Sequence, residues 1–310
     1  MTTYIYPTPH KDKLVALLLN DKLPVEDKPR VEEAIVVYTN WIKNLNIITS
    51  AGLPPQQTLN KMIELLNEYK FYIDLNLVFD SPRDFLYRQK GQLKIDNTII
   101  EEFLPRLAHP SVIPEIIDMD VTVGPKKCFS SVYFESSLDA PAIGGGLRVR
   151  SKDQDFAISK KLFLKASHTQ DYKESLETET FLSYVSAECK TNLDKTMFQE
   201  GCATAHDTKV AVPGSKYFLL CEWLDMTPLS TAPTDIDEIL LLRKAKRLNS
   251  NIRKKFSSYS GRQEKRDYFI NYLKSHPFRV EVFERFIEHI RKLIQNEVPV
   301  EHNVMELGYF

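Results

Sequence analysis

The sequence lacks the signals that mark several classes of protein. Its four cysteines lie far apart and form no C-x-x-C pair, so neither a zinc site nor a disulfide framework is indicated. No apolar run approaches the roughly 18 residues of a membrane span, and the N-terminal segment has no apolar core of signal-peptide type. We therefore expect a soluble cytoplasmic protein with reduced thiols and no membrane partner.

The chain also lacks a large net charge, which is −1 for 310 residues, so it is not a polycation. Its charges are unevenly distributed. From Arg243 to Arg266 there are ten Lys/Arg residues and one acid, Glu264, whereas from Asp171 to Asp207 there are eight acids and three basic residues. This pattern suits a metal-dependent enzyme that acts on a polyanion, although a solvated helix face is the plainer explanation.

The length favours one large or two unequal domains. In the first 120 residues, apolar residues recur at helical spacing over 31–45 and 59–72, which predicts a mainly helical region. The character changes to β after Val121. We therefore expect a helical N-terminal region over 1–120 and a second domain over 121–310.

The second region predicts an α/β core. Strands are expected over 128–135, over 147–167 as one or two strands, over 180–191 and over 216–223. The last is nearly all apolar, which favours a buried, parallel position. Asp194 is placed to cap a helix that runs towards residue 205, and further helices are expected from Asp235, over 265–273 and over 280–295.

The run FLSYVSAECKT contains a candidate catalytic pair, Glu188 and Lys190. Residues two apart on a strand share a face, so these two side chains project together while Cys189 faces the core. If the flanking strands pair about a centre between residues 171 and 172, Asp155 lies opposite Glu188. A two-residue shift of register would instead bring Asp153 there, so this geometry leaves the choice of aspartate open.

Two carboxylates, the backbone carbonyl of Cys189 and waters would form the oxygen-rich shell that Mg²⁺ prefers. The metal would polarise a scissile phosphate and acidify a bound water, which Lys190 could orient. The alternative is an ordinary surface salt bridge between Lys190 and one of the carboxylates, contributing roughly 0–1 kcal/mol.

Longer segments add a resemblance. DQDFAISKKLFLKASH, SAECKTNLDKTMFQE, FLLCEWLDMTPLST and EILLLRKAKRLNSNIRKK resemble the type II restriction endonucleases of the Bpu10I and BbvCI kind, a branch of the PD-(D/E)xK nucleases, over about residues 120–290. The resemblance implies a mixed sheet flanked by helices. It assigns the catalytic residues to Asp155, Glu188 and Lys190, with Asp155, Glu188 and the Cys189 carbonyl as metal ligands. Gln154 stands where the motif has proline.

The basic segment RKAKRLNSNIRKK suits a DNA-contacting helix, in which cations bind phosphates and other side chains reach base edges. The candidates are Arg243, Lys244, Arg247, Asn249, Asn251, Arg253, Lys254 and Lys255.

We therefore predict a Mg²⁺-dependent, site-specific endonuclease that acts on double-stranded DNA. Residues 121–310 would form its PD-(D/E)xK catalytic domain, and the helical region over 1–120 would serve DNA recognition or subunit contact. The resemblance implies 5′-phosphate ends. Because one chain carries one catalytic centre, double-strand cleavage would need a second subunit, identical or different. The alternatives are a structure-specific repair or resolvase-type nuclease of the same fold and a non-catalytic DNA-binding module.

Overall fold

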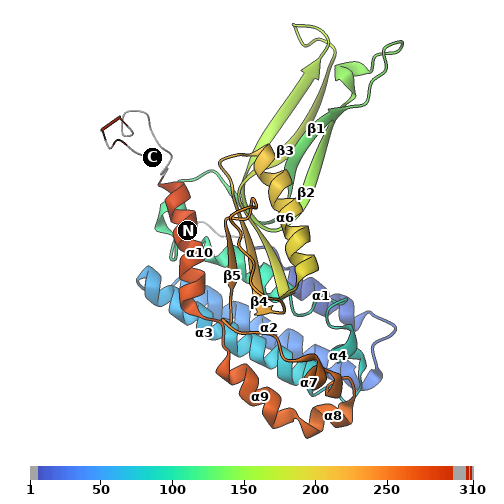
Figure 1. The fold of residues 1–310 in the computed structure, drawn as a ribbon, viewed down its shortest axis with the longest axis vertical. Helices are drawn as coiled ribbons and strands as arrows, with labels where there is room; N and C mark the ends of the chain where they lie inside the picture. Colours follow the sequence, from blue (N-terminus) through green and yellow to red (C-terminus); the bar gives the residue numbers. More distant parts are fainter. Residues whose placement is uncertain (1–5, 296–304, 307, 309–310) are drawn as a thin grey trace.

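The computed structural model describes residues 6–295, 305–306 and 308, and its centre is a five-stranded sheet with helices on both faces (Figure 1). The strands, in the order β1-β2-β3-β4-β5, are β1 (Thr122–Phe134), β2 (Leu147–Ser167), β3 (Ser175–Leu193), β4 (Lys216–Leu224) and β5 (Glu238–Leu241). The α-helices are α1 (Pro9–Leu18), α2 (Lys28–Thr49), α3 (Pro55–Tyr72), α4 (Phe85–Gln89), α5 (Thr98–Leu107), α6 (Lys195–Ala211), α7 (Ser250–Lys255), α8 (Tyr259–Glu264), α9 (Arg266–Ser275) and α10 (Val280–Ile294).

The helices before the sheet form where the apolar spacing predicts them. In α2 the buried residues recur every three or four positions, which places one stripe of the helix in the core (Val31, Ala34, Tyr38, Trp41 and Leu45). Helix α3 begins at Pro55, whose fixed φ suits a first helical position. It continues into a π-helix over Ile73–Phe79. The predicted helices over 31–45 and 59–72 are confirmed.

The sheet is mixed. Strands β1, β2 and β3 pair antiparallel, while β3, β4 and β5 pair parallel. Residues 147–167 form one continuous strand, and β3 begins at Ser175, five residues earlier than predicted. Helix α6 carries the chain between the parallel strands β3 and β4. Its N-cap is Asp194, whose Oδ1 accepts a hydrogen bond from the Met197 amide at 2.9 Å, as predicted.

Both faces of β4 are buried, which explains its almost unbroken apolar sequence. On one face Phe218 packs edge-on against Phe286 of α10, which also meets Phe156 of β2. On the other face Tyr217 and Leu219 belong to a cluster with residues of α6. The first of these clusters continues into α1, α2, α3 and α5, so one apolar core joins residues on both sides of position 120.

The helix predicted from Asp235 is wrong, because this segment forms β5. Asp237 Oδ2 accepts the Tyr217 amide at 2.8 Å and Asp237 Oδ1 accepts Lys216 Nζ at 3.0 Å, which fixes the segment at the edge of β4. The helices predicted near the C-terminus do form, as α9 and α10.

Buried charges tie the C-terminal helices to the N-terminal ones. Arg262 of α8 is fully buried, and its guanidinium donates to the carbonyls of Phe79, Ser81, Arg83 and Phe256 at 2.8–3.0 Å. It also reaches Asp84 Oδ1 at 3.1 Å. These bonds hold the turn that follows the π-helix against α8.

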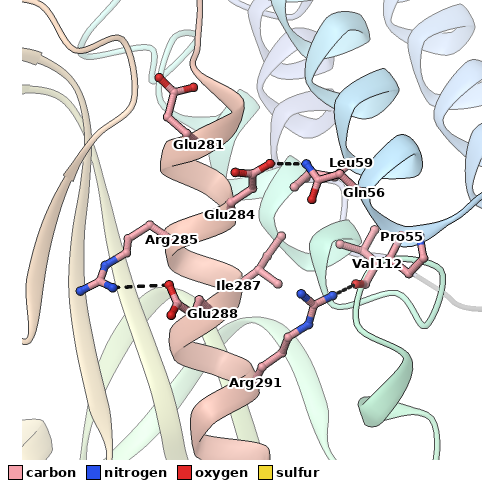
Figure 2. A pocket seen from close by; sticks show the side chains of 10 residues that line it. All are labelled: Pro55, Gln56, Leu59, Val112, Glu281, Glu284, Arg285, Ile287, Glu288 and Arg291. Atoms are coloured by element: carbon pink, nitrogen blue, oxygen red, sulfur yellow. Dashed lines mark hydrogen bonds and ion pairs between the residues drawn. The ribbon is translucent and has the colours of Figure 1, made fainter.

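A hollow of about 320 Å³ marks the seam between α10 and the start of α3 (Figure 2). Its polar side chains already have partners: Glu284 meets Gln56, Arg285 lies 3.4 Å from Glu288, and Arg291 donates to the Val112 carbonyl at 2.7 Å. Glu281 pairs with Lys244 outside the hollow at 3.0 Å. The seam thus serves helix packing. In the part of the chain described, no helix is long and apolar enough to span a membrane.

Candidate active site

The hairpin of β2 and β3 brings the predicted catalytic residues together. The last backbone pair at this end of the ladder is Phe156 opposite Ala187, so Asp155 and Glu188 come next on their strands. This register is the one that the sequence predicted for Asp155. Towards the tip of the hairpin the pairing shifts by one residue after Ile158, and the shift leaves the register at the site unchanged.

Each acidic side chain is held by a neighbouring group. Asp155 Oδ2 accepts a hydrogen bond from the Cys189 amide at 2.8 Å. Glu188 Oε1 lies 2.6 Å from Lys190 Nζ, and Glu188 Oε2 accepts the Tyr217 hydroxyl at 3.1 Å. Cys189 points the opposite way and is buried, as the alternation of the strand predicts. Asp153 is exposed and stands outside this network.

The carboxyl groups of the site are buried close to one another, which raises the pKa of two of them. Burial, together with the charge of Glu188, raises the pKa of Asp155. Glu101 of α5 is also buried, and burial and the charge of Asp155 raise its pKa to about 7. Burial alone would lower the pKa of Lys190, but the hydrogen bond to Glu188 and the charges of Glu188, Asp155 and Glu200 together outweigh burial and raise this pKa. A cation added among these groups would relieve their repulsion.

The site lies in a hollow of about 650 Å³ with walls from both halves of the chain. Asp155, Glu188 and Lys190 line it from the sheet. The N-terminal half contributes, among others, Arg88, Lys90, Lys94 and Asn97, and the C-terminal half contributes Arg247, Arg253 and Tyr272. The hollow therefore combines an acidic group with a largely basic rim.

The predicted DNA-contacting helix is only partly present, because residues 243–249 precede α7 and are not helical. The prediction that Arg243 lies on an exposed helix face is wrong. Its side chain is 4% exposed and bonds to Glu222 Oε2 at 3.1 Å and to the His276 carbonyl at 2.8 Å. Arg243 is thus part of the buried framework and is not available to DNA.

The other candidates lie nearer the surface. Lys244 pairs with Glu281 at 3.0 Å, and Arg247 pairs with Asp225 at 2.7 Å. Arg253 donates to the Leu248 carbonyl. Asn249 immediately precedes α7, and Asn251, Lys254 and Lys255 are exposed on it. Lys254 and Lys255 form no salt bridge with any residue that the structure describes.

Sequence reasoning missed three residues near the site: Glu101, Tyr217 and Lys94. Nothing in the sequence distinguishes Glu101 from a surface acid, because the burial of every residue of α5 becomes evident only in the structure. In the sequence, Tyr217 cannot be distinguished from the other apolar residues of its buried strand. Lys94 sits in a turn with φ +53°, a left-handed conformation uncommon for lysine, and lines the hollow with Asp155.

A solved structure with the same arrangement of sheet and helices identifies the fold class of this protein. This structure, described as the native BbvCI A2B2 tetramer at low resolution, matches with a TM-score of 0.50 and 20% sequence identity, over 88% of this chain and 99% of that one. The protein thus has a restriction-endonuclease-like fold.

The family follows from the sequence. The model of the Bpu10I restriction endonuclease family matches residues 92–310, and the chain belongs to that family. This confirms the resemblance seen in the sequence segments. A search among curated proteins finds no match.

Proposed function

We propose that the protein is a cytoplasmic, Mg²⁺-dependent type II restriction endonuclease that hydrolyses DNA at a specific sequence. One observation supports this most directly: Asp155, Glu188 and Lys190 lie together on neighbouring strands at the wall of a hollow with a basic rim. Membership of a restriction endonuclease family agrees with that chemistry.

The donor groups fit Mg²⁺. Asp155 and Glu188 supply carboxylate oxygens and Cys189 a backbone carbonyl. Among the described residues no three His, Cys, Asp or Glu side chains form a metal-binding group. Mg²⁺ does not require one, because it commonly takes one or two carboxylates and keeps several waters. Glu101, whose pKa is raised to about 7 beside Asp155, is a further acid that a nearby cation would hold ionised.

When bound, the ion would polarise the scissile phosphate and lower the pKa of the attacking water. The chain's own residues position the other participants. The Cys189 amide fixes one oxygen of Asp155 and leaves Oδ1 for the ion. Lys190 would orient the water and balance the negative charge that builds up on the phosphate oxygens. Attack by water forms a new P–O bond as the P–O3′ bond breaks, which leaves 5′-phosphate and 3′-hydroxyl ends.

DNA would lie across the basic rim. From the C-terminal side we retain Lys244, Arg247, Asn249, Asn251, Arg253, Lys254 and Lys255 as candidate contacts, and we withdraw Arg243. From the N-terminal side we add Lys94, whose charge partly offsets the rise that burial causes in the pKa of both Asp155 and Glu101. The helical region over 1–120 would then form one wall of the DNA-binding hollow, with the catalytic domain over 121–310 forming the rest.

Double-strand cleavage requires two catalytic centres, and each chain has one. We therefore propose that the active enzyme contains a second subunit. The solved structure with the same fold is described as a tetramer of two kinds of chain, which is consistent with such an assembly.

The proposal is tested by incubating the purified chain with phage and plasmid DNA and Mg²⁺, with EDTA as control. A restriction endonuclease gives discrete fragments, or discrete nicks if its partner is a different chain. Cleavage of branched DNA alone would instead identify a structure-specific nuclease. The absence of any nicking at high protein concentration would identify a DNA-binding module.

A further inference from the structure

The hydroxyl of Tyr217 reaches the proposed catalytic carboxylate of Glu188 from inside the protein. Tyr217 is fully buried on β4, which pairs parallel with β3 so that Tyr217 lies beside Ser186, two residues before Glu188. Its hydroxyl donates to Glu188 Oε2 at 3.1 Å. Tyr217 is not among the residues that line the hollow around the site. The hydroxyl is therefore placed to act on Glu188 and not to touch a ligand in the hollow.

The position of this hydroxyl is fixed by its surroundings. The tyrosine ring belongs to the buried apolar cluster that also contains Phe198, Ala205 and Leu219, between β4 and α6. The backbone amide of Tyr217 donates to Asp237 Oδ2 at 2.8 Å. Because protein interiors are close-packed, a buried ring held in this way has no second position to move to. Tyr217 is thus a fixed hydrogen-bond donor at Glu188 Oε2.

The other oxygen of Glu188 has a partner that is free to move. Glu188 Oε1 lies 2.6 Å from Lys190 Nζ, and the Lys190 side chain is 21% exposed and lines the hollow. Its ammonium group stands on a flexible four-carbon stem. Lys190 would therefore swing away when a divalent cation reaches Oε1, because like charges repel. The uncharged, buried hydroxyl of Tyr217 has neither this repulsion nor this freedom, so it stays on Oε2.

Asp155 is held in the same manner, with its Oδ2 bonded to the Cys189 amide at 2.8 Å. Each proposed carboxylate ligand thus keeps one oxygen on a fixed donor of the protein and offers the other. This arrangement suits Mg²⁺, which has a compact octahedral shell and keeps several waters. Ca²⁺ takes about six to eight oxygens and readily binds both oxygens of one carboxylate. For Glu188, that two-oxygen mode would require loss of the hydrogen bond from Tyr217.

We propose that Tyr217 is a positioning residue whose hydroxyl restricts Glu188 to one-oxygen coordination and so favours Mg²⁺ over Ca²⁺ at this centre. The inference rests on the proposed function, because it requires an ion bound by Glu188. It adds the residue that sets which ion the centre prefers. Phenylalanine at position 217 would fill the same space without the donor. A purely structural role for Tyr217 therefore predicts no change in ion preference on this substitution.

The test is ion binding by the full chain, measured without DNA so that cleavage plays no part. The electron paramagnetic resonance signal of free Mn²⁺, followed during displacement by Mg²⁺ or Ca²⁺, gives the dissociation constants of both ions. In Tyr217→Phe we expect the affinity for Ca²⁺ relative to Mg²⁺ to rise about tenfold, which corresponds to one hydrogen bond to a charged group. The matched control, Tyr69→Phe, removes another buried hydroxyl, which lies 2.7 Å from His10 Nε2, and should leave the ratio unchanged. Circular dichroism melts establish that the variants are folded.

A second measurement needs only the wild type. In crystals soaked with Mn²⁺, anomalous scattering locates the ion, and we expect it on Glu188 Oε1 with Oε2 still bonded to Tyr217. An ion on both oxygens, or an unchanged Ca²⁺ to Mg²⁺ ratio in Tyr217→Phe, would overturn the inference. The variant Glu188→Ala separates this failure from that of the proposed function. If it binds Mn²⁺ as tightly as the wild type, the ion does not occupy this centre and the proposed metal site fails as well.

Discussion

Asp153 and Asp155 lie two residues apart on β2, but only Asp155 is held against β3 by a backbone amide. Asparagine at position 155 keeps an oxygen that can accept this bond and removes the charge that a metal ion requires. We expect Asp155→Asn to reduce cleavage by about a hundredfold or more, with little change in the melting temperature. Asp153→Asn, at an exposed position, should keep most of the activity. Initial rates of plasmid cleavage by the two variants measure this difference. If Asp153→Asn were the less active variant, the metal ligand would be Asp153.

At the scale of residues, the sequence predicts contacts within one hairpin well. The pairing of Asp155 with Glu188 could be predicted by counting residues from the centre of the hairpin, because strand alternation and a short connection allow few registers. Glu101 and Lys94 could not be found in this way. They reach the site only because α5 and the turn before it pack beside the sheet, and no local pattern specifies that packing.

At the scale of elements, the guanidinium of Arg262 connects α8 to the turn after the π-helix. Arg262→Met would leave four carbonyl oxygens and the Asp84 carboxylate without this donor. Because the position is fully buried, we expect a loss of about 3 kcal/mol or more in the free energy of unfolding, measured with urea. Arg266→Met is the control. This side chain is 38% exposed and pairs with Asp80, so its loss should cost about 1 kcal/mol or less. Equal losses would mean that Arg262 is not a structural link.

Two lysines of helix α7 are expected to contribute to DNA affinity. Lys254 and Lys255 are exposed, whereas Arg247 already pairs with Asp225. If both lysines contact phosphates, replacing them with alanine should flatten the plot of log affinity against log salt by about 1.8 and leave sequence preference intact. Fluorescence anisotropy in Ca²⁺ measures this slope. The matched control, Lys11→Ala/Lys13→Ala on α1, should leave it unchanged. An unaltered slope in the α7 variant would place the phosphate contacts elsewhere on the rim.

The elements themselves were predictable where burial is uniform. Strand β4 is apolar on both faces, and α2 and α10 carry clear apolar stripes. Strand β5 lies where the sequence predicts a helix, because Thr234 and Asp237 suit the N-cap and N3 positions of a helix that starts at Asp235. It becomes a strand through pairing with β4 and through the bonds of Asp237 to Lys216 and Tyr217. These are tertiary interactions that outweigh local propensity.

At the scale of the whole molecule, the sequence indicated a helical region followed by a nuclease core, and the structure joins them through one apolar core. The N-terminal half also contributes part of the wall around the candidate site. The sequence does not show which residues of the N-terminal half form this wall, because they are scattered over short turns without a motif. The extension of β1, β2 and β3 beyond the helices (Figure 1) was likewise not predictable, since strand length in the sequence does not show which part of a strand remains uncovered.

We propose that Asp155, Glu188 and Lys190 form a metal-dependent nuclease centre. The decisive experiment is Glu188→Ala, with binding measured in Ca²⁺ and cleavage measured in Mg²⁺ on the same DNA. The substitution removes one proposed ligand and leaves the basic rim intact. We expect cleavage to fall by about a thousandfold or more while affinity for the specific site is retained. Full cleavage by the Glu188→Ala variant would exclude this strand as the catalytic centre.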